Sequence, residues 1–179
     1  MSAQDQTAAV RDAGAPDAAA CAAVYAPYVR DTAISFELEA PDAAEMGRRI
    51  EAASASHAWL VLEDGGDVIG YAYGARLHSR PAYRWSCEVS VYVEMGRRRT
   101  GAGRALYEAL FERLAARGFR NVIAGLTVPN EASAGLHRAM GFRHIGTYRN
   151  IGYKLGRWHD VAYFQREISD PGYPPAEPR

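Results

Sequence analysis

The chain has 179 residues, 48% of them hydrophobic and 23% charged, which is typical of a globular protein with one domain. Lys and Arg total 21 and Asp and Glu also total 21, so the chain lacks the basic excess of most nucleic-acid-binding proteins. No run approaches the ~18 apolar residues of a membrane span, and the first residues contain no apolar signal-peptide segment. We expect a cytoplasmic protein without nucleic-acid or membrane partners, and the two cysteines, Cys21 and Cys87, fit a reducing compartment.

Hydrophobic periodicity and turn residues divide the chain into alternating elements. The predicted elements follow one another in this order: strand 10–11, helices 16–29 and 41–53, strands 59–63, 67–77 and 85–93, helix 101–117, strand 121–128, helix 131–140, and strands 143–153 and 158–168. This order predicts a layered α/β (α+β) fold in which helices cover a central sheet. Residues 8–168 are assigned to one domain, 1–7 to a disordered N-terminus and 169–179 to a Pro-rich tail.

A loop rich in arginine and glycine joins the strand at 85–93 to the helix at 101–117. Its arginines 97–99 directly precede the first helical turn, where the partial positive charge of a helix disfavours cations. A bound anion would remove this conflict, because the first backbone N–H groups of a helix are unpaired and point outward. Gly101 and Gly103 lack a Cβ atom, so an anion can approach the backbone closely. The alternative interpretation is a solvated basic turn.

The spacing of this loop indicates which anion it binds. It lacks the Gly-Lys-Ser/Thr of a Walker A loop and the last glycine of a dinucleotide-binding fingerprint. It matches the pattern Arg/Gln-x-x-Gly-x-Gly/Ala as Arg98-Arg99-Thr100-Gly101-Ala102-Gly103. This motif, placed between an apolar strand and a helix, resembles the pyrophosphate-binding loop of the GNAT acetyltransferase superfamily.

The strand before the loop alternates between apolar and polar residues. One face carries the apolar residues and Cys87, which we interpret as a core residue. The other face carries Ser86, Glu88, Ser90 and Tyr92. If that face lines a cleft, partial burial should raise the pKa of Glu88, and such a carboxylate can accept a proton from an amine substrate. The alternative is a glutamate that faces solvent on an open sheet.

Four further segments resemble the phosphinothricin N-acetyltransferase branch of the GNAT superfamily: 80–93, 128–137, 140–142 and 152–161. The similarity extends over residues 10–167, and the last of the four segments is the most specific to this branch. The resemblance implies one GNAT domain with a mixed, mostly antiparallel central sheet flanked by helices. It also implies acetyl-CoA as co-substrate, a small-molecule amine as acceptor, and a homodimer.

The resemblance further implies roles for individual residues. Glu88 corresponds to the general base, and His137 stands where many relatives have a tyrosine that protonates the leaving thiolate. His137 would therefore protonate or hydrogen-bond the thiolate, although without the family a packed histidine is the simpler interpretation. The positions that correspond to acetyl-CoA-binding residues are Val91, Tyr92, Val93, Arg98, Arg99, Thr100, Gly101, Ala102, Gly103, Arg104, Asn130 and Ser133. The positions that correspond to the acceptor site are Phe36, Tyr73, His78, Arg80 and Tyr83.

Two of these positions bear on the identity of the acceptor. Arg80 can bind a carboxylate or another oxyanion through two parallel hydrogen bonds. His78 departs from the herbicide-resistance enzymes of the branch, which carry a lysine two residues before that arginine. The loss of a fixed cation weakens the case for a phosphinate acceptor, so methionine sulfone and methionine sulfoximine become at least as suitable.

No metal site is expected. The histidines form no His-Glu-x-x-His motif and the cysteines no Cys-x-x-Cys pair; they stand at His57, His78, His137, His144 and His159. We interpret His159 and the adjacent Asp160 as structural residues. Two other functions remain open: a CoA-binding sensor or pseudoenzyme, which needs no base, and a GNAT enzyme for another amine, such as an aminoglycoside or a protein N-terminus.

Overall fold

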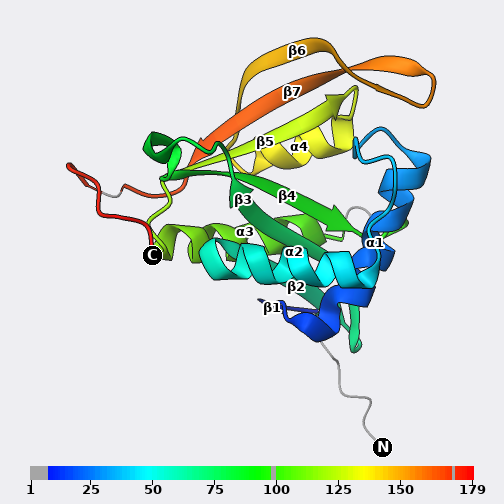
Figure 1. Ribbon diagram of the computed structural model, residues 1–179, viewed down its shortest axis with the longest axis horizontal. Helices are drawn as coiled ribbons and strands as arrows, with labels where there is room; N and C mark the ends of the chain where they lie inside the picture. Colours follow the sequence, from blue (N-terminus) through cyan, green and yellow to red (C-terminus); the bar gives the residue numbers. More distant parts are fainter. Residues whose placement is uncertain (1–7, 98–99, 171) are drawn as a thin grey trace, which may run out of the picture.

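The computed structural model describes residues 8–97, 100–170 and 172–179. A seven-stranded sheet in the order β1-β2-β3-β4-β5-β7-β6 forms its centre, with helices on both faces (Figure 1). The elements are β1 (Ala9–Asp12), a 3₁₀ turn (Ala15–Asp17), α1 (Ala18–Asp31), α2 (Ala43–Ser56), β2 (Ala58–Asp64), β3 (Asp67–Arg76), a 3₁₀ turn (Pro81–Tyr83), β4 (Ser86–Val93), α3 (Ala102–Ala116), β5 (Asn121–Val128), α4 (Glu131–Ala139), β6 (Arg143–Lys154) and β7 (Arg157–Glu167). The predicted fold class and order of elements are confirmed.

The sheet is antiparallel except where β4 meets β5. These two strands run parallel and pair only through 86–88 and 121–123. Farther along, each strand keeps its other neighbour, since β4 still pairs with β3 and β5 with β7. The strands therefore diverge after Glu88, and Figure 1 shows the opening between their ends. This opening is the feature around which the candidate site is built.

Two apolar cores lie on opposite faces of the sheet. On one face, α3 buries Leu106, Leu110 and Leu114 completely, as their spacing of four residues requires for one face of a helix. On the other face, α1 and α2 cover an aromatic layer that includes Trp59 and Tyr71. Each fully buried leucine contributes roughly 1.5–3 kcal/mol of transfer free energy. The core under α3 contains residues of both β4 and β5 and so fixes the two strands on either side of the opening.

The first helix differs from its prediction at both ends. Pro16 lies in the 3₁₀ turn, and α1 begins at Ala18 and ends at Asp31. The helix also continues through Pro27, which is unusual because proline lacks the N–H for the helical hydrogen bond. Residues 1–7, predicted to be disordered, lie outside the described part of the chain.

The proline-rich tail packs against the domain. The indole Nε1 of Trp85 donates to the carbonyl oxygen of Ala176 at 2.7 Å, and Arg84 forms an ion pair with Glu177 at 2.6 Å. Both cysteines are buried and free. In the ranges that the structure describes, no helix has both the length and the apolar character needed to cross a membrane.

Candidate active site

A narrow cavity of about 50 Å³ lies between the diverging strands, with α3 and α4 at its sides. Its walls bring together five of the residues predicted from the sequence: Val91, Tyr92, Asn130, Ser133 and His137. Because β4 and β5 are not paired with each other along this stretch, their facing backbone groups have no sheet partner there. Such groups are ready to bind the amide or carbonyl groups of an extended ligand.

Glu88 occupies the last paired position before the strands separate. It lies opposite Ala75 of β3 and Ile123 of β5. The side chain reaches solvent, yet the protein around it removes part of its hydration, which raises the pKa of the carboxyl; nearby His78 acts in the opposite direction. The expected upward shift of the pKa is thus present, and the carboxylate lies where the cleft begins.

His137 is buried, with 3% of its surface exposed. Its Nδ1 lies 2.7 Å from the carbonyl oxygen of Ser133, and its Nε2 lies 3.0 Å from the hydroxyl of Tyr107. A carbonyl only accepts, so Nδ1 carries the proton and Nε2 accepts from Tyr107 in the neutral imidazole. Burial lowers the pKa of His137 and raises that of Tyr107. Both groups are neutral, which favours hydrogen bonding over proton donation by His137.

The turn that leads into α3 contains a glycine in a left-handed conformation. Gly101 is the N-cap and has a φ of +83°, a conformation that residues with a Cβ atom rarely adopt. The hydroxyl of Thr100 donates to the carbonyl oxygen of Arg97 at 3.0 Å. Arg97 itself is held by Glu94 and Asp64 at 2.9 and 2.8 Å. Its charge is therefore already neutralised, and it is a poor candidate for binding a phosphate.

The other loop positions differ in what the structure says of them. Arg98 and Arg99, both predicted to bind the cofactor, lie outside the described residues. Arg104 is exposed in the first turn and is 3.4 Å from Glu108. A Cβ atom on Gly103 would lie 3.0 Å from Leu136 Cδ2. The missing side chain of Gly103 therefore allows α3 to pack against α4.

Asn130 and Ser133 form the start of α4. Asn130 is the N-cap, as predicted, and its Oδ1 accepts from the backbone N–H of Ser133 at 3.2 Å. The hydroxyl of Tyr28 donates to the carbonyl oxygen of Val93 at 2.5 Å, so this part of β4 is anchored to α1. The predicted cofactor-binding residues on β4 and α4 thus face each other across the opening.

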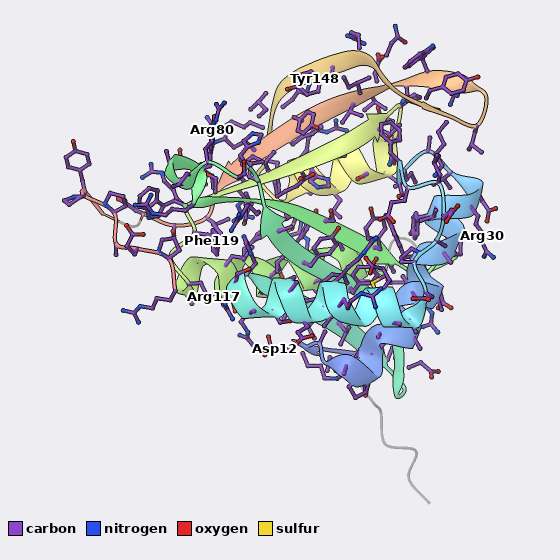
Figure 2. The ribbon with its side chains drawn as sticks, viewed as in Figure 1. Asp12, Arg30, Arg80, Arg117, Phe119 and Tyr148 are labelled. Carbon is purple, nitrogen blue, oxygen red and sulfur yellow. The ribbon has the colours of Figure 1, made fainter. Side chains whose placement is uncertain are left out.

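The predicted acceptor residues come from three separate segments. Tyr73 of β3 lies opposite Ser90 of β4 and is hydrogen-bonded to it. The rings of His78 and Tyr83 are in contact at 4.7 Å. Arg80, on the loop before β4, has an exposed side chain that pairs with none of the described carboxylates (Figure 2). Tyr73, His78 and Glu88 therefore belong to one region, with Tyr83 at its edge.

Phe36, the remaining predicted acceptor residue, lies on the loop between α1 and α2. Its ring lies against Gly152, where a Cβ atom would approach within 2.2 Å, and its centroid is 6.1 Å from the ring of His159. A larger cavity, about 340 Å³, lies between α2 and the sheet and shares Tyr73 in its wall. None of the predicted cofactor-binding residues lines it, so we place the chemistry at the opening between β4 and β5.

Two residues of this region were not predicted from the sequence. Tyr107 has the spacing of an ordinary core residue on α3, and only the folded chain brings it to His137, thirty residues away. Lys154 is buried against the loop that carries Phe36. The one sequence feature that could have identified it is its composition, because it is the single lysine of the chain. Among the described residues, no cluster of three metal-ligating side chains is present.

Comparison with known proteins agrees with this geometry. A family model described as "Acetyltransferase (GNAT) domain" matches residues 10–162. A phosphinothricin N-acetyltransferase of Streptomyces viridochromogenes is 36% identical over 174 residues, covering 97% of this chain and 95% of that protein. An L-methionine sulfoximine/L-methionine sulfone acetyltransferase of Pseudomonas paraeruginosa is 35% identical over 164 residues, covering 90% of this chain and 95% of that protein.

A solved structure is similar over nearly the whole chain. It is a GNAT superfamily phosphinothricin acetyltransferase from Sinorhizobium meliloti, in complex with AcCoA. The TM-score is 0.88 and the sequence identity 36%, covering 97% of this chain and 94% of that one.

Proposed function

The chain belongs to the GNAT family of N-acetyltransferases, and we propose that it transfers the acetyl group of acetyl-CoA to the α-amine of a small amino acid or amino-acid analogue. The observation that carries this proposal is the position of Glu88, which lies where β4 and β5 separate and has a raised pKa. A base at that point can reach an amine at the entrance of the cleft. A thioester can lie between the two strands behind it.

The residues at the opening fit acetyl-CoA in two respects. The facing backbone groups of β4 and β5 are free of sheet partners, which suits the amides of a pantetheine arm. Val91 and Val93 would be its partners on β4, although the carbonyl oxygen of Val93 already accepts from Tyr28. The first turn of α3 begins at a glycine with positive φ, which suits a pyrophosphate. Residues 98–104 would hold the pyrophosphate, and Asn130 and Ser133 would line the other side.

In the proposed reaction the ammonium of the acceptor first loses a proton to Glu88, directly or through water. The free amine attacks the thioester carbonyl in a ternary complex, without a covalent enzyme intermediate. Backbone N–H groups near Val91 and Tyr92 stabilise the oxyanion. The C–S bond then breaks, the nitrogen releases its second proton to water as the amide forms, and the thiolate takes a proton from water.

The pair formed by Tyr107 and His137 assists the departure of the thiolate. In the neutral pair, the hydroxyl of Tyr107 is the available donor and His137 is the acceptor that orients it. The hydroxyl can turn toward the sulfur as negative charge develops there. We therefore assign hydrogen bonding, and not proton transfer, to His137 and Tyr107.

The acceptor class rests on Phe36, Tyr73, Arg80 and Tyr83, and on His78 as the position that selects among analogues. Relatives named for phosphinothricin and for methionine sulfoximine and sulfone are about equally similar to this chain. The test is a panel of methionine sulfone, methionine sulfoximine, phosphinothricin and the standard amino acids, ranked by kcat/KM from the release of free CoA. Tight acetyl-CoA binding without release for any amine would favour a CoA-binding sensor. Release of CoA only with amines outside the panel would show that the acceptor belongs to another class of amine.

We further propose that two copies of the chain form a dimer through the β6–β7 hairpin. Six large apolar side chains on this hairpin are 55–60% exposed: Ile145, Tyr148, Ile151, Tyr153, Leu155 and Trp158. Exposed apolar patches of this kind mark protein–protein contacts. A second copy related by a two-fold axis would cover the patch with the same residues.

A further inference from the structure

Lys154 stands out by composition. The chain contains 21 basic residues, and all of them except Lys154 are arginines. The positive charges on the surface therefore belong to arginines, whereas the one lysine side chain is buried, with 6% of its surface exposed. An ammonium is compact and can donate in three directions, while a guanidinium is planar and larger. This one position thus calls for a small cation.

The ammonium of Lys154 joins two segments that are far away in the sequence. Its Nζ donates to the carbonyl oxygens of Val29 and Ser35, both at 2.6 Å. Val29 lies in the last turn of α1, where carbonyl groups have no partner within the helix and the helix dipole favours a cation. Figure 1 shows the tip of the β6–β7 hairpin next to the loop that follows α1.

This arrangement is costly for a residue that only fills space. Burial lowers the pKa of Lys154, and the charge of Glu37 nearby opposes that shift. Lys154 forms no ion pair with any carboxylate in the described ranges. A buried cation held mainly by carbonyl groups is less favourable than a methionine of similar length would be in a purely apolar contact. We therefore attribute the presence of a buried ammonium to its hydrogen bond with the loop that contains Ser35.

That loop carries Phe36 directly after Ser35. The carbonyl oxygen of Lys154 accepts from Nε2 of His159 at 2.9 Å, and the ring of His159 lies beside Phe36. Lys154 thus acts on Phe36 from two sides, through its ammonium on Ser35 and through its backbone on His159. Gly152, on the same strand, leaves the space that the ring of Phe36 occupies.

A second set of contacts holds the loop from the opposite side. The hydroxyl groups of Ser35 and Tyr25 are 2.6 Å apart, and Tyr25 also donates to Glu37 at 2.9 Å. Arg49 of α2 completes this set with an ion pair to Glu37 at 2.6 Å. Ser35 is therefore fixed both through its side chain and through its carbonyl oxygen. Among the described residues, only the lysine connects the loop to the hairpin by hydrogen bonds from a charged group.

We propose that Lys154 is a positioning residue for the acceptor site: its buried ammonium holds loop 32–42 against the β6–β7 hairpin and thereby sets Phe36 as a wall for the acceptor. That Phe36 contacts the acceptor rests on the function proposed above. The clamp itself does not depend on the identity of the acceptor, and neither Lys154 nor Phe36 lines the cavity proposed for acetyl-CoA.

The kinetic test compares Lys154→Met, which keeps the length of the side chain and removes its donors, with Lys154→Arg, which keeps the charge. Arg157→Met is the matched control, since Arg157 is an exposed cation on the same hairpin. With methionine sulfone as the acceptor probe, Lys154→Met is expected to raise the KM for the acceptor about tenfold or more and to leave the KM for acetyl-CoA within about twofold. Lys154→Arg should recover part of the loss, and Arg157→Met should behave as the unaltered enzyme.

Two outcomes of this test would overturn the proposal. One is an unchanged KM for the acceptor in a folded Lys154→Met protein. The other is an equal rise of both KM values, which would mean general loosening and no specific effect on Phe36. If Lys154→Met does not fold, the same comparison of KM values is made on Lys154→Arg, where the larger guanidinium should still raise only the acceptor KM.

A second measurement needs no acceptor. Amide hydrogen exchange of residues 32–42 should be faster in the Lys154 variants than in the unaltered protein, while exchange in α3 stays the same. Because Lys154 is the single lysine, protein labelled with ¹³C-lysine gives one side-chain signal that reports directly on its burial and titration. If no amino acid in the panel is acetylated, the proposed acceptor class fails and the exchange data still decide the role of Lys154. Unchanged exchange in 32–42 would reject that role.

Discussion

The hydroxyl of Tyr107 and Nε2 of His137 lie 3.0 Å apart in the wall of the cleft. The imidazole has one proton when neutral, and Nδ1 holds it against the carbonyl oxygen of Ser133. Since burial lowers the pKa of His137, no second proton is available near neutral pH. The phenol is therefore the group of this pair that can donate toward a negative sulfur atom.

Replacing either member of the pair should slow the reaction without abolishing it. Tyr107→Phe removes a hydrogen bond to a developing charge, roughly 1.5–3 kcal/mol, and should lower kcat about ten- to a hundredfold. His137→Leu leaves the Tyr107 hydroxyl without a buried acceptor and should have a similar effect. Because the two residues act together, the double variant should cost little more than either single one. Additive losses in kcat would mean that they act independently.

Glu88→Gln should lower kcat by about 100- to 10 000-fold, the usual contribution of a general base, with acetyl-CoA binding retained. A carboxyl group accepts a proton only when ionised, so kcat/KM should fall as the pH falls through its pKa. Because that pKa is raised above 4.5, the fall should occur at higher pH than for an ordinary glutamate, and the variant should lack it. Glu112→Gln, on the exposed side of α3, is the control. Near-normal turnover of Glu88→Gln would remove Glu88 as the base.

The arginines before α3 should differ in their importance for acetyl-CoA. Arg97 is already paired with Glu94 and Asp64, so Arg97→Ala should leave the KM for acetyl-CoA nearly unchanged. Arg98, the first residue of the motif, should bind the pyrophosphate, and Arg98→Ala should raise that KM about tenfold or more through the loss of a charge-assisted hydrogen bond. Initial rates at varied acetyl-CoA measure both effects. Equal KM values for the two variants would contradict the assignment of the loop.

Gly152→Ala should disturb the acceptor site by steric means. A Cβ atom on Gly152 would lie 2.2 Å from Cε2 of Phe36, so the ring must move. We expect the KM for the acceptor to rise several-fold while the KM for acetyl-CoA stays the same. In the Phe36→Ala background the added Cβ meets no ring, so Gly152→Ala should not raise the KM for the acceptor further. A further rise of the acceptor KM in the double variant would show that Phe36 is not the residue displaced.

Charged residues introduced into the proposed interface test the dimer. Light scattering should give the mass of two chains for the unaltered protein and of one chain for the Ile151→Glu/Trp158→Glu variant, because two buried carboxylates per copy oppose association. Tyr173→Glu, at a fully exposed position of the tail, should remain a dimer. A monomer in the unaltered protein would reject this interface.

Most of the fold could be predicted from local patterns. The alternation of apolar and polar residues in β4 is enough to place Glu88 on the polar face of that strand, and the spacing of Leu106, Leu110 and Leu114 predicts α3. Packing decided what local patterns could not. The hydrogen bond from Tyr107 to His137 joins two helices, and the burial of Lys154 depends on a hairpin that folds back onto α1. No periodicity in the sequence specifies such contacts.

The incomplete pairing of β4 with β5 has a consequence for thermal stability. Beyond Glu88 and Ile123 the described ladder between the two strands stops, so the sheet lacks hydrogen bonds that a bound pantetheine arm would add. A ligand that binds only the folded chain raises the free energy of unfolding by about 2.7 kcal/mol at a hundred times its Kd. Acetyl-CoA should therefore raise the melting temperature. Amides in the second half of β4 should gain protection from exchange before those of the outer strands, because the ligand takes the place of the missing pairing.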